Sequence, residues 1–221
     1  VDGQTASAAE VNQNFTDLVT GVNAIVFKDD TLFNTATGAN SLQFITSGEA
    51  NTANGYQALF NLTTGNNNTA SGGKALFNNT EGNGNTASGY QALFKNSTGL
   101  QNTASGSGAL KLNTTGKQNT ASGFQALTNN TEGNENTAIG GSALRKNSLG
   151  KKNTASGRQA LAENTEGDKN TASGYEALFF NTTGNFNTAI GRGADVTTGA
   201  LENATAIGYN AKVSASNTVQ I

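Results

Sequence analysis

The sequence predicts an all-β protein, a parallel β-solenoid built of 17-residue coils, preceded by a short N-terminal coiled-coil helix. Three observations carry this prediction: a repeat of fixed period, an unusual composition and an apolar heptad near the N-terminus. The 221 residues include 28 Gly but no Pro, Cys, Met, Trp or His, which is not the composition of an ordinary globular domain. A regular, repetitive fold is therefore expected.

The repeat starts with Asn every seventeen residues, and its consensus reads NTASGYQALFNNTTGN followed by a variable residue. Ala holds the third place and Gly the fifth place of every unit. The units begin at Asn34, Asn51, Asn68, Asn85, Asn102, Asn119, Asn136, Asn153, Asn170 and Asn187, and a shortened eleventh unit begins at Ala204. Fixed periods near this length are typical of solenoids, and a unit this short and this rich in Gly and Asn cannot supply two helices.

Each unit is expected to form one β-coil, with T-A-S-G and Q-A-L-F as short strands. A tight corner at the Gly and a longer polar turn through N-N-T-T-G-N would join them, because Asn and Gly tolerate positive φ and Thr and Asn bond the local backbone. Coils stacked about 4.8 Å apart would make a rod roughly 50 Å long. The predicted domains are residues 1–33, an N-terminal helix or coiled coil with a connector, and residues 34–221, a β-solenoid head of about eleven coils.

The ninth place of the unit predicts the core. It is Leu in every unit until Asp195, and the predicted ladder is Leu59, Leu76, Leu93, Leu110, Leu127, Leu144, Leu161 and Leu178, continuing from Leu42. The tenth place accepts Lys111 and Arg145, so it is expected to meet water, as adjacent strand residues point opposite ways. One Leu, one or two Ala and a Thr methyl would contribute about 2–4 kcal/mol per coil, against about 1–2 kcal/mol per residue of backbone ordering. Copies of the same chain are therefore expected to complete the core.

The N-terminal segment predicts a seed for that assembly. Its apolar residues are spaced 4, 3, 4 and 3 apart, which is a coiled-coil seam: Val11, Phe15, Leu18, Val22 and Ile25. Ser7 and Glu10 form a capping box that would start the helix, and Gly21 weakens it. A parallel coiled coil would set the number and register of chains. The alternative is an amphipathic helix that lies against its own rod.

Several motifs resemble the head repeats of trimeric autotransporter adhesins, the YadA-like heads, whose units run N-S-V-A-I-G. These are NTAIG at Asn136 and at Asn187, NATAIG at Asn203–Gly208 and SNTVQI at Ser216–Ile221, and the resemblance covers residues 34–221. It implies a homotrimer of left-handed parallel β-rolls that displays binding surfaces on an extracellular bacterial fibre. It also implies that the Thr and Ser of T-x-S face inward. The longer unit and the frequent Ser before Gly depart from the family.

The same repeats are also similar to those of phage and bacterial trimeric fibres that carry an endosialidase-type chaperone domain after an N-T-V-Q-I segment. That domain does not follow Ile221, so the chain would be a cleaved product. The stretch SAAEVNQNF is similar to the start of secreted bacterial fibre proteins after signal removal.

The aromatic residues suggest a contact surface. Phe60, Phe77 and Phe94 share the tenth place of three successive coils and would stack, flanked at the sixth place by Tyr56 and Tyr90. Exposed aromatic strips usually mark binding surfaces, so this column is expected to contact either a partner or a neighbouring protomer.

Charged residues fall opposite one another at the repeat period. Three pairs are predicted on consecutive coils: Lys146 with Glu163, Lys151 with Asp168, and Glu135 with Lys152. Exposed pairs contribute only about 0–1 kcal/mol each, so they would fix register more than stability. Alternatively, Arg145, Lys146, Lys151 and Lys152 would form a basic patch for anionic glycans.

Composition argues against several functions. Without His or Cys, most catalytic and transition-metal sites cannot be assembled, so neither an enzyme nor a cofactor is expected. The Asp-rich nonapeptide of calcium β-rolls is missing. A net charge of -2 offers no basic field for nucleic acid, and no run of 18 apolar residues predicts membrane insertion.

The expected function is a non-catalytic, structural and adhesive segment of an extracellular trimeric fibre on a bacterial surface. Its partners would be its own copies and a cell-surface protein or glycan of a host or prey cell. Three alternatives stay open. They are a phage tail-fibre shaft on a virion, a self-polymerising filament with end-to-end contacts near Ile221, and an ice-binding solenoid that uses T-x-S columns such as Thr69 and Ser71.

Overall fold

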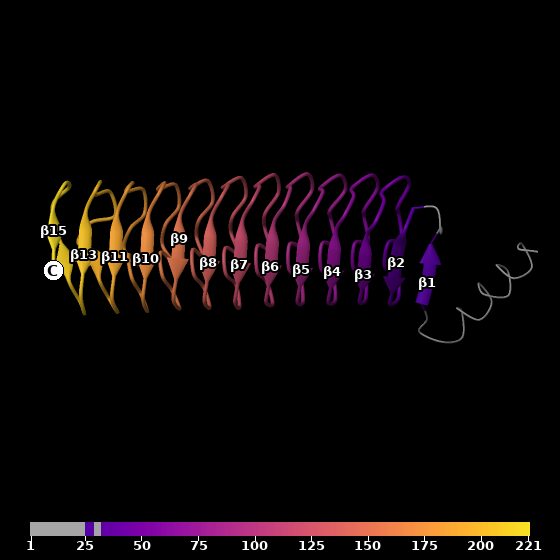
Figure 1. The fold of residues 1–221 in the computed structure, drawn as a ribbon, viewed down its shortest axis with the longest axis horizontal. Coiled ribbons are helices and arrows are strands. Elements are labelled where there is room, and N and C mark those ends of the chain that lie inside the picture. The colour runs from indigo at the N-terminus through magenta and orange to yellow at the C-terminus, as the bar shows by residue number, and fades with distance from the viewer. Residues whose placement is uncertain (1–24, 29–31) are drawn as a thin grey trace, which may run out of the picture.

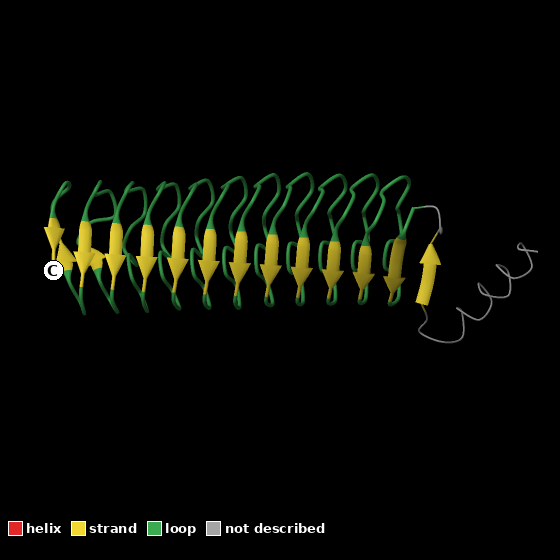
Figure 2. Ribbon diagram, in the orientation of Figure 1, coloured by secondary structure: helices red, strands yellow, loops and turns green. Residues whose placement is uncertain are grey.

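The protein forms a β-solenoid in which short strands stack side by side along one axis, in a computed structural model that describes residues 25–28 and 32–221 (Figure 1). Those residues contain strands, turns and loops but no helix (Figure 2). Thirteen strands form a single sheet that runs the length of the rod, and two more form a small second sheet near the C-terminus. The all-β solenoid and its repeat of seventeen residues are confirmed.

The strands are mostly three residues long. In chain order they are β1 (Ile25–Lys28), β2 (Asn34–Thr37), β3 (Thr52–Asn54), β4 (Thr69–Ser71), β5 (Thr86–Ser88), β6 (Thr103–Ser105), β7 (Thr120–Ser122), β8 (Thr137–Ile139), β9 (Thr154–Ser156), β10 (Thr171–Ser173), β11 (Thr188–Ile190), β12 (Asp195–Val196), β13 (Thr205–Ile207), β14 (Lys212–Val213) and β15 (Val219–Gln220).

The register of the long sheet follows the repeat. From β2 to β13 the strands are parallel, and each residue pairs with the one at the same place of the next unit, as Thr69 pairs with Thr86 and Ala70 with Ala87. The last step is shorter, because Thr205 pairs with Val219. The eleventh coil therefore closes in fourteen residues, which is the predicted shortening.

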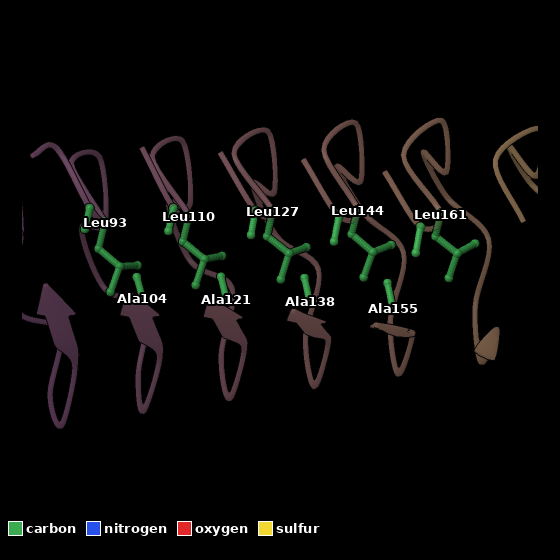
Figure 3. Close-up of a cluster of buried hydrophobic side chains, with 14 of the residues drawn as sticks. Leu93, Ala104, Leu110, Ala121, Leu127, Ala138, Leu144, Ala155 and Leu161 are labelled. Carbon is green, nitrogen blue, oxygen red and sulfur yellow. The ribbon is translucent and has the colours of Figure 1, made fainter. Parts of the chain in front are cut away.

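The predicted Leu ladder is the core. All eight predicted Leu side chains, and Leu42 before them, are fully buried. In Figure 3 the Leu side chains extend across the narrow interior towards Ala104, Ala121, Ala138 and Ala155 of the strands. The eighth-place Ala next to each Leu from coil two to coil nine is also fully buried. A coil thus encloses one Leu and two Ala, and the Leu and Ala predictions are confirmed.

The predicted second strand, Q-A-L-F, is wrong. Its Gln and Leu residues have left-handed backbones, as in Gln125 with φ 54° and Leu127 with φ 51°, and no strand accommodates such angles. This segment is a turn in each coil. The amide of Leu127 still donates to the carbonyl of Ala143 on the next coil at 2.9 Å, so inter-coil bonds persist where the strand pattern does not.

The polar turn through N-N-T-T-G-N was expected, but the burial of its twelfth-place Asn, and of the Asn that opens each unit, was not. Asn at the first and twelfth places is fully buried in the central coils and forms two ladders along the rod. Asn119 donates from its backbone and side chain to Asn102 Oδ1 at 3.0 and 3.1 Å. Asn130 donates to Asn113 Oδ1 at 2.7 Å. Both side chains also donate to the carbonyl of Gly133, at 2.8 and 2.9 Å, so each coil is tied to itself and to its neighbour.

The N-terminal prediction is corrected at Ile25. This residue was assigned to the coiled-coil seam, but it begins strand β1, which pairs antiparallel with β2 in the register Ile25 to Thr37. The other seam residues, Val11, Phe15, Leu18 and Val22, lie outside the described residues. Strand β1 covers the edge of the first coil, where unpaired backbone groups would otherwise face solvent.

Candidate functional site

The outer face of the long sheet is a regular surface, which we call the hydroxyl face. It consists of the exposed second-place Thr and fourth-place Ser of the strands, namely Thr69, Ser71, Thr86, Ser88, Thr103, Ser105, Thr120, Ser122, Thr154, Ser156, Thr171 and Ser173. The Ala between each Thr and Ser is buried. The expectations that T-x-S faces inward and that a Thr methyl joins the core are therefore wrong, since only one of the two alternating sets can face the interior.

The hydroxyl face is a two-dimensional array. Parallel strands place equivalent residues about 4.8 Å apart along the rod, and alternate residues of one strand about 6.6 Å apart across it. Thr stands at the second place of every coil from Thr35 to Thr205. Ile139 and Ile190 replace Ser at the fourth place and are 49% and 46% exposed. The array thus mixes hydroxyl groups with methyl groups and a few larger apolar side chains.

The predicted aromatic column forms a continuous stack. Phe60 and Phe77 have ring centroids 5.0 Å apart and Phe77 and Phe94 5.2 Å apart, with nearly parallel planes, and Phe44 packs edge-on against Phe60. The three stacked side chains are half-buried. Because both faces of the Phe77 ring lie against other rings, the middle of the column presents mainly ring edges to solvent. Contact with a partner or protomer remains a prediction.

Tyr56 and Tyr90, predicted to flank that column, are 53% and 56% exposed. They stand at the sixth place, at the tight corner that follows the strand, where Phe124 is also exposed. Among the described residues no ring contact joins them to the Phe column. They therefore border the hydroxyl face.

Three of the four cations of the predicted basic patch, Arg145, Lys146 and Lys152, have acidic partners. Glu163 binds Lys146 Nζ and lies 3.3 Å from Arg145 Nη2, and Lys152 Nζ lies 3.8 Å from Glu135. Asp168 accepts a hydrogen bond from the backbone amide of Lys151 at 2.6 Å rather than an ion pair from its side chain. Two of the three predicted ion pairs are confirmed, and Glu163 is shared by Arg145 and Lys146.

Sequence reasoning missed a second charged feature, which we call the Arg–Tyr ladder: Arg158, Tyr175, Arg192 and Tyr209. These residues occupy the sixth place of four successive coils. The guanidinium carbon of Arg158 lies 5.8 Å from the Tyr175 ring, and that of Arg192 lies 5.5 Å from Tyr175 and 5.8 Å from Tyr209. The sequence signal for it is the alternation of Arg and Tyr at the sixth place of the last four units.

Other kinds of site are not formed by the part of the chain that the structure describes. Within residues 25–28 and 32–221 no three acidic side chains gather as a metal cage would require. In the same ranges no helix is long and apolar enough to span a bilayer. A shallow groove over coils five to seven is lined by side chains of both signs, including Lys117, Glu132, Glu135 and Lys151.

Comparisons with protein families, with curated proteins and with solved structures found no match. The surfaces described above are therefore interpreted from their own chemistry.

Proposed function

We propose that this chain is a rigid, non-catalytic segment of an extracellular trimeric fibre that holds and presents an adhesive surface. The solenoid supports the rigid role, because its core and its Asn ladders continue from coil to coil without interruption over most of its length. The neighbouring coils of such a rod share both apolar contacts and buried hydrogen bonds, so bending would disturb both.

The observation that carries the assembly is the hydroxyl face. A surface whose side chains recur at one fixed step fits an identical surface, because every coil of one copy then meets a coil of the next. Thr presents a methyl group as well as a hydroxyl, and the outward Ile139 and Ile190 add apolar area. Val219 continues the Thr column at the last strand and is 66% exposed. In the trimer, we place this face of each chain against its sister chains.

A charge placed on this face tests that arrangement. Ser122→Arg would put a guanidinium in the middle of the proposed interface, and we expect it to dissociate the trimer, because an unpaired charge is costly to bury. Thr115→Arg is the matched control, because Thr115 is exposed at the fourteenth place, outside the hydroxyl face. Sedimentation velocity measures the mass of each variant. A Ser122→Arg protein that sediments like the control would contradict the assignment of this face.

Ice binding is a second candidate, favoured by the outward orientation of the same Thr and Ser side chains. A flat array of hydroxyl and methyl groups is the kind of surface that can order water into a lattice. The two candidates exclude each other, because a face buried between chains cannot meet ice. A measurement of thermal hysteresis separates them: the fibre proposal predicts no activity, and clear activity from a monomeric protein would favour ice binding.

A further inference from the structure

Within the part of the chain that the structure describes, the two arginines of the Arg–Tyr ladder have no acidic partner, a property that they share with several lysines such as Lys169. The chain has three arginines. Arg145 is paired with Glu163, whereas neither Arg158 nor Arg192 forms an ion pair with any residue that the structure describes. Both are exposed at the tight corner of the coil, at the border of the hydroxyl face.

The tyrosines hold these two guanidinium groups in place. Tyr175 lies between Arg158 and Arg192, and Tyr209 lies beyond Arg192. A guanidinium stacked on a ring keeps its N–H groups at its edge, where they are free to donate two parallel hydrogen bonds to a carboxylate. Stacking also restricts the side chain before a ligand arrives, which lowers the entropy lost on binding.

The spacing of the ladder selects a class of ligand. Arg158 and Arg192 are two coils apart, about 10 Å along the rod. In an extended polysaccharide one sugar ring advances by about the same distance as one coil, so charges on every second sugar would meet the two arginines in turn. The acidic Glu176 beside Tyr175, and a net charge of -2, make a uniformly dense polyanion a poorer fit.

We propose that Arg158 and Arg192 bind a linear acidic polysaccharide that carries a carboxylate on every second sugar. This inference rests on the proposed function, since it names the ligand of the adhesive surface. Because the ladder lies at the corner of the coil, it stays at the rim when the hydroxyl face meets other chains. Three ladders on one trimer would strengthen binding to a long polymer by multivalency.

The test uses the 221-residue chain and hyaluronan, which alternates a uronate with a neutral sugar. Binding is measured by biolayer interferometry at low salt, with neutral dextran and a single-stranded oligonucleotide as comparison ligands. We expect wild-type protein to bind hyaluronan and to bind the two comparison ligands poorly. The affinity for hyaluronan should fall as salt is added.

Variants then assign the binding to the ladder. The double variant Arg158→Gln with Arg192→Gln should weaken hyaluronan binding by about tenfold or more, because two charge-assisted contacts are lost. The affinity of the double Arg→Lys variant for hyaluronan should lie between those of wild type and the double Gln variant, since an ammonium group keeps the charge but lacks the planar guanidinium geometry. Arg145→Gln is the control and should change the Kd by less than about twofold, because that half-buried arginine is already paired with Glu163.

Several results would overturn the proposal. The first is that wild-type protein does not bind hyaluronan. The second is that the Arg145→Gln variant loses as much affinity as the double Gln variant. The third is that wild-type protein binds the oligonucleotide as tightly as hyaluronan. The mass of each sample separates this inference from the proposed function. A trimer that does not bind hyaluronan overturns the ladder alone, whereas a monomer that binds it contradicts the trimer and leaves the ladder assigned.

Discussion

At the residue scale, buried asparagine distinguishes this solenoid from one held by apolar contacts alone. In the twelfth-place ladder from Asn96 to Asn164, each Asn side chain donates hydrogen bonds to the Asn before it and to a glycine carbonyl of its own coil. It also accepts a hydrogen bond from the Asn after it. Buried hydrogen bonds in series reinforce one another in a medium of low polarity, and an unmade bond there is expensive. The interior therefore tolerates a polar side chain only when the whole ladder is complete.

Asn130→Ala tests the ladder. The change removes two donated bonds and one accepted bond, which leaves Asn113 Oδ1 without its donor and the Asn147 side-chain amide with only one of its two acceptors. We expect the free energy of unfolding to fall by about 2–4 kcal/mol. The control is Asn129→Ala, whose side chain makes no hydrogen bond with the described residues and which should change stability by less than about 1 kcal/mol. Equal urea midpoints for the two variants would contradict the role of the ladder.

Asp195 introduces a charge where earlier coils carry Leu. Its carboxylate is buried, accepts hydrogen bonds from the backbone amides of Val196 and Phe180, and lies 3.5 Å from Lys212 Nζ. Burial raises the pKa of Asp195, while the two amides and Lys212 act in the opposite direction. A raised pKa means that the folded chain holds this proton more tightly than the unfolded chain does. The stabilising contribution of the protonated form is therefore lost as pH rises through the folded pKa.

Asp195→Asn should remove this pH dependence and keep an acceptor for the two amides. We expect the Tm of the variant, relative to wild type, to rise as pH increases from about 3 to about 7, because only the wild-type side chain becomes charged. Thermal melts followed by circular dichroism measure this difference. A Tm difference between the two proteins that stays constant over that pH range would contradict the interpretation.

At the element scale, the coil depends on close stacking of its glycine corners. Gly140 has φ +125°, and a Cβ there would lie 2.6 Å from the carbonyl carbon of Gly157 on the next coil. Its neighbour Gly141 has room, since the nearest atom to a Cβ would be 4.0 Å away. Three further residues of each coil have a left-handed backbone. At two of these places the residue is usually Gln or Leu, and inter-coil hydrogen bonds of the backbone keep these residues in that conformation.

Adjacent glycines therefore give a matched pair of substitutions. Gly140→Ala should destabilise the protein by about 3 kcal/mol or more, because the new methyl group clashes with backbone that cannot move without separating two coils. Gly141→Ala should be neutral or stabilise by up to about 1 kcal/mol. Chemical denaturation measures the free energy of unfolding of both variants. A similar decrease in the two would contradict the claim that close packing of the glycine corners stabilises the coil.

At the scale of the whole molecule, the two ends of the rod differ. The first coil is covered by the antiparallel strand β1, while β15 pairs on one side with β13, and beyond it Ile221 is 86% exposed. A filament that continues the parallel stack from one chain to the next would have to replace β1. End-to-end contact near Ile221 remains a prediction.

Much of this architecture could be predicted from the sequence, because the chain supplies its own comparison. The period, the Thr-Ala-Ser strand and the Leu column all follow from which places vary and which do not. The burial of Asn did not follow, since Asn is also the ordinary residue of turns. The left-handed backbone of the ninth-place Leu residues could not be predicted either, because Leu disfavours that conformation. The outward turn of Thr and Ser was missed although the signal existed: the third place is always Ala, whereas the fourth varies among Ser, Thr, Asn and Ile.

The mass of the 221-residue chain in dilute solution, by light scattering after size exclusion, tests the central claim that three copies of this chain assemble. The account predicts a particle of three times the 22.5 kDa chain mass. A particle of one chain mass that unfolds in a single sharp transition would contradict it.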